Sequence, residues 1–387
     1  MLMGWFIAAN LNSFIVIPRK GSHIRRMSLR ASSFKKTFHF RFDARTSRGT
    51  MKERHSWFIK IWDESNPDCF GIGECAPLPG LSLETETEEV LNKVVDKINE
   101  SKLASTLAND LKSIYCFIKE NFVLVENHPS IIFGLETALL DLAQGGNRTL
   151  FKNEFIKGQP IPINGLIWMG GLDFMLQQIE IKIQDGFRCI KLKVGGLDYE
   201  KECDILQYIR RKYFKLDIVI RLDANGSLKP EDALYKLKGF SKFDIHSIEQ
   251  PLKPKSDFLA ELVQTSPIPV ALDEELIGIG TRATKEQLLD RVKPPYIILK
   301  PTLHGGLQSC AEWIEIAQAR NIGWWLTSAL ESNVGLNAIA QFASNYTLDK
   351  PQGLGTGALY DDNFEAPLRV DKGLLSHYQR QEWQIAE

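Results

Sequence analysis

Five ionisable residues follow one another through the second half of the chain at nearly equal intervals. The intervals are 30, 26, 24 and 27 residues, and each residue ends a short apolar run: Lys193, Asp223, Glu249, Asp273 and Lys300. An interval of this length accommodates one strand and one helix. Buried parallel strands are expected to be almost wholly apolar, so charged groups at five successive strand ends indicate a functional site.

The three carboxylates in the middle of this series predict a metal site. Asp223, Glu249 and Asp273 end consecutive strands, which lie about 4.8 Å apart in a sheet. Three anions at that spacing repel one another unless a cation lies between them. Oxygen ligands favour a hard ion, so we expect Mg²⁺, with Mn²⁺ as an alternative. Any one of the three alone is equally well explained as a helix N-cap or a surface charge.

The lysines suit proton transfer. In CIKLKVGG, Lys191 and Lys193 are two residues apart on a predicted strand and therefore point to the same face. We expect the two ammonium groups and a nearby divalent ion to lower the lysine pKa, which suits a general base. Solvated lysines on an edge strand are the simpler alternative for a lone K-x-K. Lys300, which ends YIILK, is predicted to face Lys193 across the metal.

A base on each side of a bound carboxylate can remove or return the proton on the neighbouring carbon, and the metal can neutralise the enediolate that forms. A lysine that forms a Schiff base would need no metal triad, so an aldolase fits less well.

The elements that must position these residues alternate regularly. From Ile161 onward, short apolar runs alternate with helical stretches, as in CIKLKV followed by YEKECDILQYIRRKY. This pattern predicts βα units and a parallel sheet. Charged residues at the end of every strand favour a closed barrel, whose active site lies at the carboxyl ends of its strands. An open doubly wound sheet would bind its ligand at one switch point instead.

The first part of the chain has a different pattern of predicted elements, with strands followed by helices. Residues 34–72 alternate as strands in FHFRFDA and WFIKIWD, joined by the polar stretch TSRGTMKERH. The stretch GIGECAPLPGLS is predicted to be a loop that closes over the barrel mouth. Helical spacing follows from Glu84 to about Gly145, so an α+β unit is expected. We predict four parts: an extension at 1–26, disordered or arising from an early start codon; a capping domain at 27–150; the barrel at 151–360; and a C-terminal segment at 361–387 that returns to the cap.

Composition excludes several classes of protein. The 387 residues carry 47 Lys and Arg against 48 Asp and Glu, a formal net charge of −1, with 44% hydrophobic residues. This balance is typical of a globular protein and offers no footprint for nucleic acid or an anionic membrane. The apolar N-terminal run is interrupted too early for a membrane helix. Six scattered cysteines predict free thiols in a reducing compartment, so the cytoplasm is expected.

Other residues have plain structural interpretations. His246 is predicted to pack within its strand and His304 to belong to a turn. Trp324 and Trp325 are predicted to pack in the core and the helix layer. In GLGTGALY the glycines suit a tight closure of the barrel, and a phosphate cradle would need a Walker lysine that is absent.

Five short motifs, in this order and spacing, resemble the enolase superfamily, in its muconate-lactonizing-like branch. They are KLKVG, RLDANG, SIEQP, ALDEEL and IILKP, and the resemblance covers residues from about 36 to 365. Further motifs narrow it within the branch: TSRGT at 46–50, GECAPLPGLS at 73–82, GLETALLDL at 134–142, INGLIW at 163–168 and TSALESNVG at 327–335. The resemblance implies a small N-terminal capping domain and a (β/α)7β barrel.

The resemblance also implies roles at matching positions. Lys193 would remove the α proton, Lys191 would modulate its pKa, and Lys300 would stabilise the enediolate by its charge. The implied Mg²⁺ ligands are Asp223, Glu249 and Asp273, supported by Asn225 and Glu274. The implied pocket residues are Ser328 and, in the loop of the cap, Pro77, Leu78 and Leu81.

The implied activity is that of a Mg²⁺-dependent lyase acting on a small-molecule carboxylate. It is the syn dehydration of a succinyl-hydroxycyclohexadiene carboxylate to o-succinylbenzoate in menaquinone biosynthesis. An N-acylamino acid racemase shares the whole catalytic set and is the alternative. Dipeptide epimerases of the branch bind the substrate ammonium through an Asp-x-Asp that GLGTGALY lacks. A metal-stabilised barrel that only binds partners fits poorly, because lysines beside a metal cost stability without catalysis.

Overall fold

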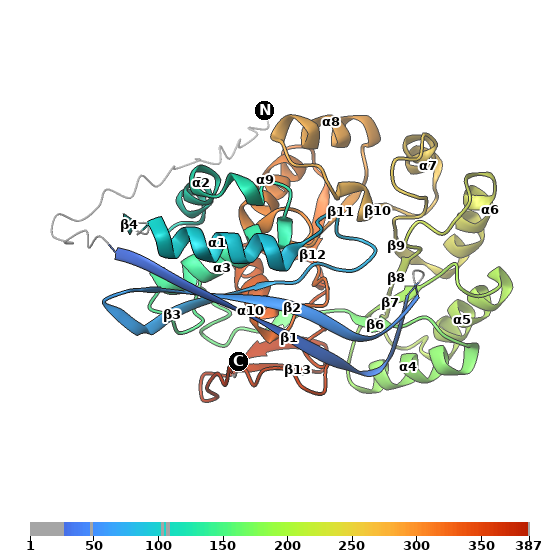
Figure 1. Ribbon diagram of the computed structural model, residues 1–387. Helices are drawn as coiled ribbons and strands as arrows, with labels where there is room; N and C mark the ends of the chain where they lie inside the picture. Colours follow the sequence, from blue (N-terminus) through green and yellow to red (C-terminus); the bar gives the residue numbers. More distant parts are fainter. Residues whose placement is uncertain (1–26, 47–48, 102–103, 106–108, 386–387) are drawn as a thin grey trace, which may run out of the picture.

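The computed structural model describes residues 27–46, 49–101, 104–105 and 109–385. The predicted extension at 1–26 lies outside the described residues. Figure 1 shows an antiparallel sheet with helices on one side of the molecule and a ring of strands and helices on the other. The first unit covers one end of the second.

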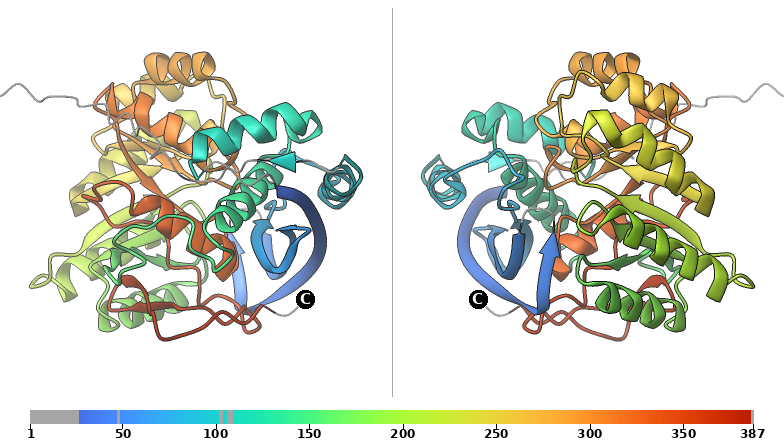
Figure 2. Two further views of the ribbon diagram at one scale, coloured as in Figure 1. Left: turned by 90° about the vertical axis from the view of Figure 1, so that its left-hand side faces the viewer. Right: turned by 90° about the vertical axis from the view of Figure 1, so that its right-hand side faces the viewer.

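The antiparallel sheet has the order β3-β2-β1-β4. Its strands are β1 (Met27–Thr46), β2 (Gly49–Asp63), β3 (Asn66–Cys75) and β4 (Ala104–Ser105). Strands β1 and β2 pair along most of their length and curve strongly, as Figure 2 shows. Because side chains alternate along a strand, the sheet has two apolar faces: Ile59 and Ile61 belong to the main core, and Phe58 to a second cluster.

Three helices accompany this sheet: α1 (Thr87–Ser101), α2 (Leu111–Asn121) and α3 (Pro129–Ala143). Helix α3 is buried from Ser130 to Leu142 because it lies between the sheet and the barrel. The glycines of β3 allow this contact. A Cβ on Gly71 would lie 1.9 Å from the carbonyl oxygen of Ala138, and one on Gly73 would lie 1.8 Å from that of Gly134. The prediction that GIGEC belongs to a loop was therefore wrong, since its glycines serve helix packing within a strand.

The barrel is a parallel sheet surrounded by helices. The described strands follow the order β12-β11-β10-β9-β8-β7-β6, so each strand neighbours the next along the chain. They are β6 (Gly165–Ile167), β7 (Cys189–Lys193), β8 (Val219–Asp223), β9 (Ile245–Glu249), β10 (Val270–Leu272), β11 (Tyr296–Leu299) and β12 (Gly323–Leu326). The helices are α4 (Leu172–Gln184), α5 (Tyr199–Lys212), α6 (Pro230–Phe240), α7 (Leu259–Thr265), α8 (Arg282–Val292), α9 (Gly306–Gln318) and α10 (Asn333–Ala343). The described chain also has three single 3₁₀ turns. One lies in the cap, at η1 (Val123–Val125), and two lie in the barrel, at η2 (Ser241–Phe243) and η3 (Glu274–Leu276).

A short segment after α10 closes the ring. The amide of Gln352 donates to the carbonyl of Pro162 at 2.8 Å, and the amide of Gly353 donates to that of Leu326 at 2.8 Å. This segment therefore bridges the first and last strands as an eighth, in parallel orientation. Each of the seven preceding strands is followed by a helix, which confirms the predicted (β/α)7β barrel and its α+β cap.

The C-terminal segment contacts both units. Strands β13 (Leu368–Asp371) and β14 (Leu374–His377) form a small sheet with β5 (Ile161–Pro162) at the entry to the barrel. Just before them, the amide of Asp361 donates to the carbonyl of His39 in the cap. The domain boundaries at 150 and 360 stay a prediction.

Two further expectations concern the whole described chain. The six cysteines are free, as predicted. Among the described residues, no helix combines the length and the apolar character that a membrane crossing requires.

Candidate active site

The carboxyl ends of the central barrel strands bring the five predicted ionisable residues together. Lys193, Asp223 and Glu249 are the last residues of β7, β8 and β9, and their Cα atoms are paired in register. Asp273 and Lys300 directly follow β10 and β11. All five therefore lie at one end of the barrel, where barrel active sites are built.

Lysine ammonium groups contact the carboxylates directly. The Nζ atom of Lys191 lies 2.8 Å from Asp223 Oδ2 and 2.6 Å from Glu249 Oε2. The Nζ atom of Lys193 lies 2.6 Å from the same Asp223 oxygen. On the other side of the mouth, Lys300 pairs with Asp273 Oδ2.

These contacts reverse one expectation about the lysine pKa. We expected Lys191 and Lys193 to lower each other's pKa. Burial does lower the pKa of Lys191, but the carboxylates of Asp223 and Glu249 outweigh it and hold the pKa well above its usual range. Burial likewise lowers the pKa of Lys300, and neighbouring carboxylates raise it overall. The prediction for Lys191 was wrong because its ammonium contacts two carboxylates rather than another ammonium.

The three carboxylates fit a hard divalent cation in type and in place. Each is at most 2% exposed. The buried Oδ1 of Asp273 accepts no hydrogen bond. Burial and the charge of Asp223 raise the pKa of Glu249 well above its usual range. Both observations indicate an excess of negative oxygen that a cation such as Mg²⁺ would neutralise.

The present side-chain arrangement is nevertheless not a metal cage. Over the part of the chain that the structure describes, no three His, Cys, Asp or Glu side chains stand together as ready ligands. The carboxylates contact lysine ammonium groups instead. Metal binding would therefore require the lysines to give up these contacts, and the metal site stays a prediction.

A chain of hydrogen bonds orients Lys193. Its Nζ donates to Asn225 Oδ1 at 2.6 Å, and Asn225 Nδ2 donates to Glu274 Oε1 at 2.9 Å. Asn225 has a φ of +45°, which asparagine tolerates better than most residues. The two predicted supporting residues thus lie together. Asn225 contacts both Lys193 and the predicted metal ligand Asp223, whose Oδ1 accepts from the backbone amide of Asn225 at 3.0 Å.

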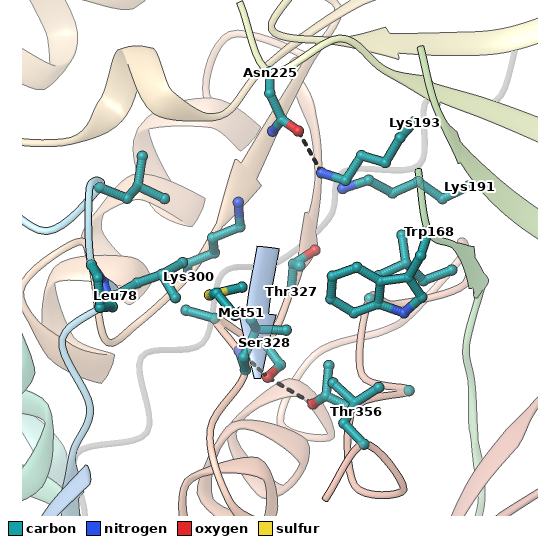
Figure 3. Close-up of a pocket in the computed structure, with 18 of the residues that line it drawn as sticks. Met51, Leu78, Trp168, Lys191, Lys193, Asn225, Lys300, Thr327, Ser328 and Thr356 are labelled. Carbon is teal, nitrogen blue, oxygen red and sulfur yellow. Dashed lines mark hydrogen bonds between the residues drawn. The ribbon is translucent and has the colours of Figure 1, made fainter. Parts of the chain in front are cut away.

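A cavity of about 360 Å³ lies above this cluster. Lys191 and Lys193 extend into it from one side and Lys300 from the other, as Figure 3 shows. This is expected, because β7 and β11 are separated by three strands on one side of an eight-membered ring. Two lysines on opposite sides of a bound carboxylate can act on opposite faces of the carbon beside it.

The loop of the cap forms one wall of the cavity. Leu78 and Leu81 line it as predicted, together with Pro79 and Gly80, whereas Pro77 is not among the lining residues. Arg54 fixes the loop by donating to the carbonyl oxygens of Ala76 and Ala329, each at 2.6 Å. The loop is therefore tied to the segment after β12.

Ser328 also lines the cavity, but its hydroxyl is already engaged. It donates to Glu331 Oε2 at 2.5 Å and accepts from Thr356 Oγ1 at 2.8 Å. It also accepts from the amide of Leu330 at 3.0 Å. Its side chain therefore shapes the wall and has no further proton to donate to a ligand.

Several wall residues were not predicted as individual residues. INGLIW contributes Trp168, and GLGTGALY contributes Thr356 and Leu359 as well as the segment that closes the barrel. Met51 follows directly after the quoted TSRGT motif. Apolar residues within these motifs were the available signal, but nothing local indicates which of them face the cavity.

The two histidines lie in different places. His246 stacks on Tyr296 with ring centroids 5.2 Å apart, away from the cavity lining, which agrees with the packing interpretation. His304 belongs to a turn, as expected, but it is buried and its Nδ1 accepts a hydrogen bond from the amide of Lys300 at 3.0 Å. Burial lowers the pKa of His304 to about 3, so the ring is neutral.

Known proteins are similar to this chain in sequence. Residues 175–380 match the family model described as Enolase C-terminal domain-like. The chain is 41% identical over 355 residues to the o-succinylbenzoate synthase of Desulfotalea psychrophila, which covers 87% of this chain and 95% of that protein. It is 27% identical over 323 residues to the o-succinylbenzoate synthase of Pasteurella multocida, covering 80% and 84% of the two chains.

Solved structures share its fold. The crystal structure of MenC from Desulfotalea psychrophila superposes with a TM-score of 0.76 at 38% identity, over 90% of this chain and 99% of that one. The L-Ala-D/L-Glu epimerase from Bacillus subtilis has a TM-score of 0.76 at 19% identity, over 92% and 96% of the chains. At that identity, the likeness shows the fold alone.

Proposed function

The chain belongs to the o-succinylbenzoate synthase family of the enolase superfamily, and from this premise we propose that it is a lyase that dehydrates a succinyl-hydroxycyclohexadiene carboxylate to o-succinylbenzoate and water. One observation supports this most strongly. Lys193 and Lys300 enter one pocket from opposite sides, and each pairs with a buried carboxylate at the strand ends. The product would serve menaquinone biosynthesis.

Lys193 is the base. Its Nζ removes the proton from the ring carbon that bears the carboxylate, and the electron pair of that C–H bond moves toward the carboxylate. The C–OH bond on the neighbouring carbon then breaks, and the ring becomes aromatic. In a syn elimination the departing hydroxide lies on the same face as the removed proton. The Lys193 ammonium can therefore return that proton, and water leaves.

Lys193 must be neutral before it can accept a proton. In the structure its Nζ donates to Asp223 Oδ2 and Asn225 Oδ1. A cation held by Asp223 would take over that carboxylate oxygen. The Asn225 amide, fixed by Glu274, would still orient the nitrogen toward the pocket.

Lys300 supplies a fixed positive charge. It is 8% exposed, and neighbouring carboxylates keep its pKa raised, so it stays protonated. A buried charge placed where negative charge develops stabilises the transition state without reorganising water. It transfers no proton to the ring carbon, because that carbon is aromatic in the product.

Asp223, Glu249 and Asp273 would hold the Mg²⁺ that members of the superfamily use, with Mn²⁺ as an alternative. When bound, the ion would neutralise negative charge on the substrate carboxylate. The pocket walls exclude water around the reacting ring, with Trp168, Met51, Leu78 and Leu81 as the apolar contacts.

The test is a direct assay of the purified protein. With Mg²⁺ and the cyclohexadiene substrate, we expect formation of the aromatic product, followed by its absorbance and by mass spectrometry. Lys193→Ala should give no detectable product while retaining its circular dichroism spectrum. A folded, Mg²⁺-loaded protein that leaves the substrate unchanged would refute the proposal.

A further inference from the structure

A carboxylate from the cap reaches the start of a barrel helix. Glu136, on α3, is fully buried. Its Oε2 accepts a hydrogen bond from the amide of Leu307, and its Oε1 accepts one from the amide of Gln308 at 3.2 Å. Both amides belong to the first turn of α9, where backbone N–H groups have no partner within the helix. Burial raises the pKa of this carboxyl group, and the two amide hydrogen bonds offset part of that rise.

Helix α9 has no capping side chain of its own. Its N-cap residue is Gly305, with a φ of +86° and no side chain to accept a hydrogen bond. The next residue, Gly306, leaves room for the carboxylate. A Cβ at Gly306 would lie 2.2 Å from Glu136 Oε2. Glu136, from the capping domain, therefore accepts the hydrogen bonds that an N-cap Ser, Thr or Asp accepts in other helices.

The turn before α9 leads straight to the active-site lysine. The amides of Leu303 and His304 donate to the carbonyl of Lys300 at 2.8 and 3.0 Å, and the amide of Gly306 donates to that of Pro301 at 2.9 Å. In the opposite direction, the amide of Lys300 donates to His304 Nδ1. The residues from Lys300 to Gly306 thus form a compact unit. A shift at the start of α9 would therefore reach the backbone of Lys300 through these hydrogen bonds.

We propose that Glu136 is a positioning residue for Lys300, and that through it the docking of the cap sets the place of the fixed positive charge in the pocket. This rests on the proposed function, because Lys300 acts there on the reacting carboxylate. The cap would thus help to position a catalytic group as well as form one wall of the pocket. A cap that is displaced from α9 leaves Lys300 misplaced while Lys193, held by Asp223 and Asn225, remains in position.

The experiment compares Glu136→Gln in two backgrounds, the unsubstituted protein and Lys300→Arg. Gln keeps the shape but offers one acceptor oxygen and turns an N–H toward α9. We expect kcat to fall about ten- to a hundredfold, as for a small displacement of a catalytic group, with KM changed less than about threefold. In the Lys300→Arg background the same change should cost less than about threefold, because residues acting through one ammonium are not additive.

Asp141→Asn is the matched control. Asp141 lies on the same helix and is equally buried, but its carboxylate accepts from the amides of Ile72 and Arg148 within the cap. This variant should lower the thermal midpoint and leave kcat within about twofold. A purely structural role for Glu136 predicts the same behaviour for both variants.

A second variant covers the case that Glu136→Gln does not fold. Gly306→Ala displaces the same carboxylate from the side of the barrel, and it should show the same loss of kcat and the same weak effect in the Lys300→Arg background. Equal losses in both backgrounds, or full activity of Glu136→Gln, overturn the inference alone. Absence of dehydration by the unsubstituted protein overturns the proposed function, and this inference with it.

Discussion

On each lysine-bearing side of the pocket, a glutamate side chain accepts hydrogen bonds from backbone amides that follow the lysine's strand, but the two glutamates come from different units of the molecule. After β7, Glu202 of α5 accepts hydrogen bonds from the amides of Gly195, Gly196 and Leu197 at 2.6 to 3.2 Å. After β11, Glu136 accepts them from the start of α9. Glu202 belongs to the helix that directly follows β7, whereas Glu136 comes from the cap.

This difference separates the chemistry of the two sides. The groups that hold the base all belong to the barrel, because Asp223, Asn225 and Glu202 lie within the βα units next to Lys193. The fixed charge of Lys300 is complete only when the cap is docked. A single fold can therefore hold its base from within the barrel and make the position of the fixed charge depend on the docked cap.

Removing the metal should disable both sides at once, because the three carboxylates lie between them. We expect EDTA to abolish activity and Mg²⁺ or Mn²⁺ to restore it. Saturating Mg²⁺, at about a hundred times Kd, should also stabilise the fold by about 2.7 kcal/mol. Asp223→Asn and Glu249→Gln should lose both effects while remaining folded. Full activity of the chelated protein would contradict the carboxylate triad.

Removing Lys193 should cost more than removing Lys300. Lys193→Ala eliminates both the proton acceptor and the donor to the leaving hydroxide, so we expect kcat to fall by roughly 10⁴-fold or more. Lys300→Ala removes one electrostatic contact and should cost roughly 10²- to 10³-fold. Steady-state kinetics on both variants, with circular dichroism as the control, measures the difference. A larger loss for Lys300→Ala would exchange the two roles.

Lys300→Arg tests whether the β11 side ever transfers a proton. Arginine keeps the charge but holds its proton too firmly to exchange it. Some dehydration should remain, within about a hundredfold of the unsubstituted protein. Any racemisation of an N-acylamino acid should disappear, because inversion needs an acid on the second face. Deuterium incorporation from D₂O reports on this directly. Racemisation that survives alongside lost dehydration would make Lys300 the essential base.

Much of the barrel and of the strand-end cluster could be predicted because the information is local. Each apolar run that ends in an ionisable residue is a strand reaching the mouth, and the regular spacing predicts that neighbouring residues share that mouth. Lys193, Asp223 and Glu249 lie in register for this reason. The pKa of Lys191 could not be predicted in the same way, since it depends on which partner its flexible chain contacts.

Contacts between distant segments could not be predicted. Glu136 and Leu307 are 171 residues apart, and nothing around either residue indicates the other. The strand glycines Gly71 and Gly73 looked like loop residues because their purpose, contact with α3, lies outside their own segment. The cavity-facing residues Met51 and Trp168 likewise depend on how the cap and barrel are placed together.

Truncating an apolar side chain of the cap loop should affect binding more than chemistry. Leu81→Ala removes apolar contact from the wall, so we expect KM to rise about three- to tenfold, with kcat within about threefold. The neighbouring Leu83, which is 68% exposed and does not line the cavity, provides the control. Leu83→Ala should change neither constant. Unchanged KM in Leu81→Ala would show that the loop does not contact the substrate.

The pH dependence of stability distinguishes the two glutamate anchors. Burial raises the pKa of Glu136 from 4.5 to about 8, so the folded protein retains a proton there that the unfolded chain releases. The free energy of unfolding should therefore fall as the pH rises from about 4.5 to about 8, by up to about 1.4 kcal/mol per pH unit for this group. Glu136→Gln should remove that contribution from denaturant curves measured across the range. Glu202→Gln should alter the slope less, because Glu202 is less completely enclosed, at 5% exposed against none for Glu136. An equal change in both variants would mean that the cap-borne anchor is no different from the one within the barrel.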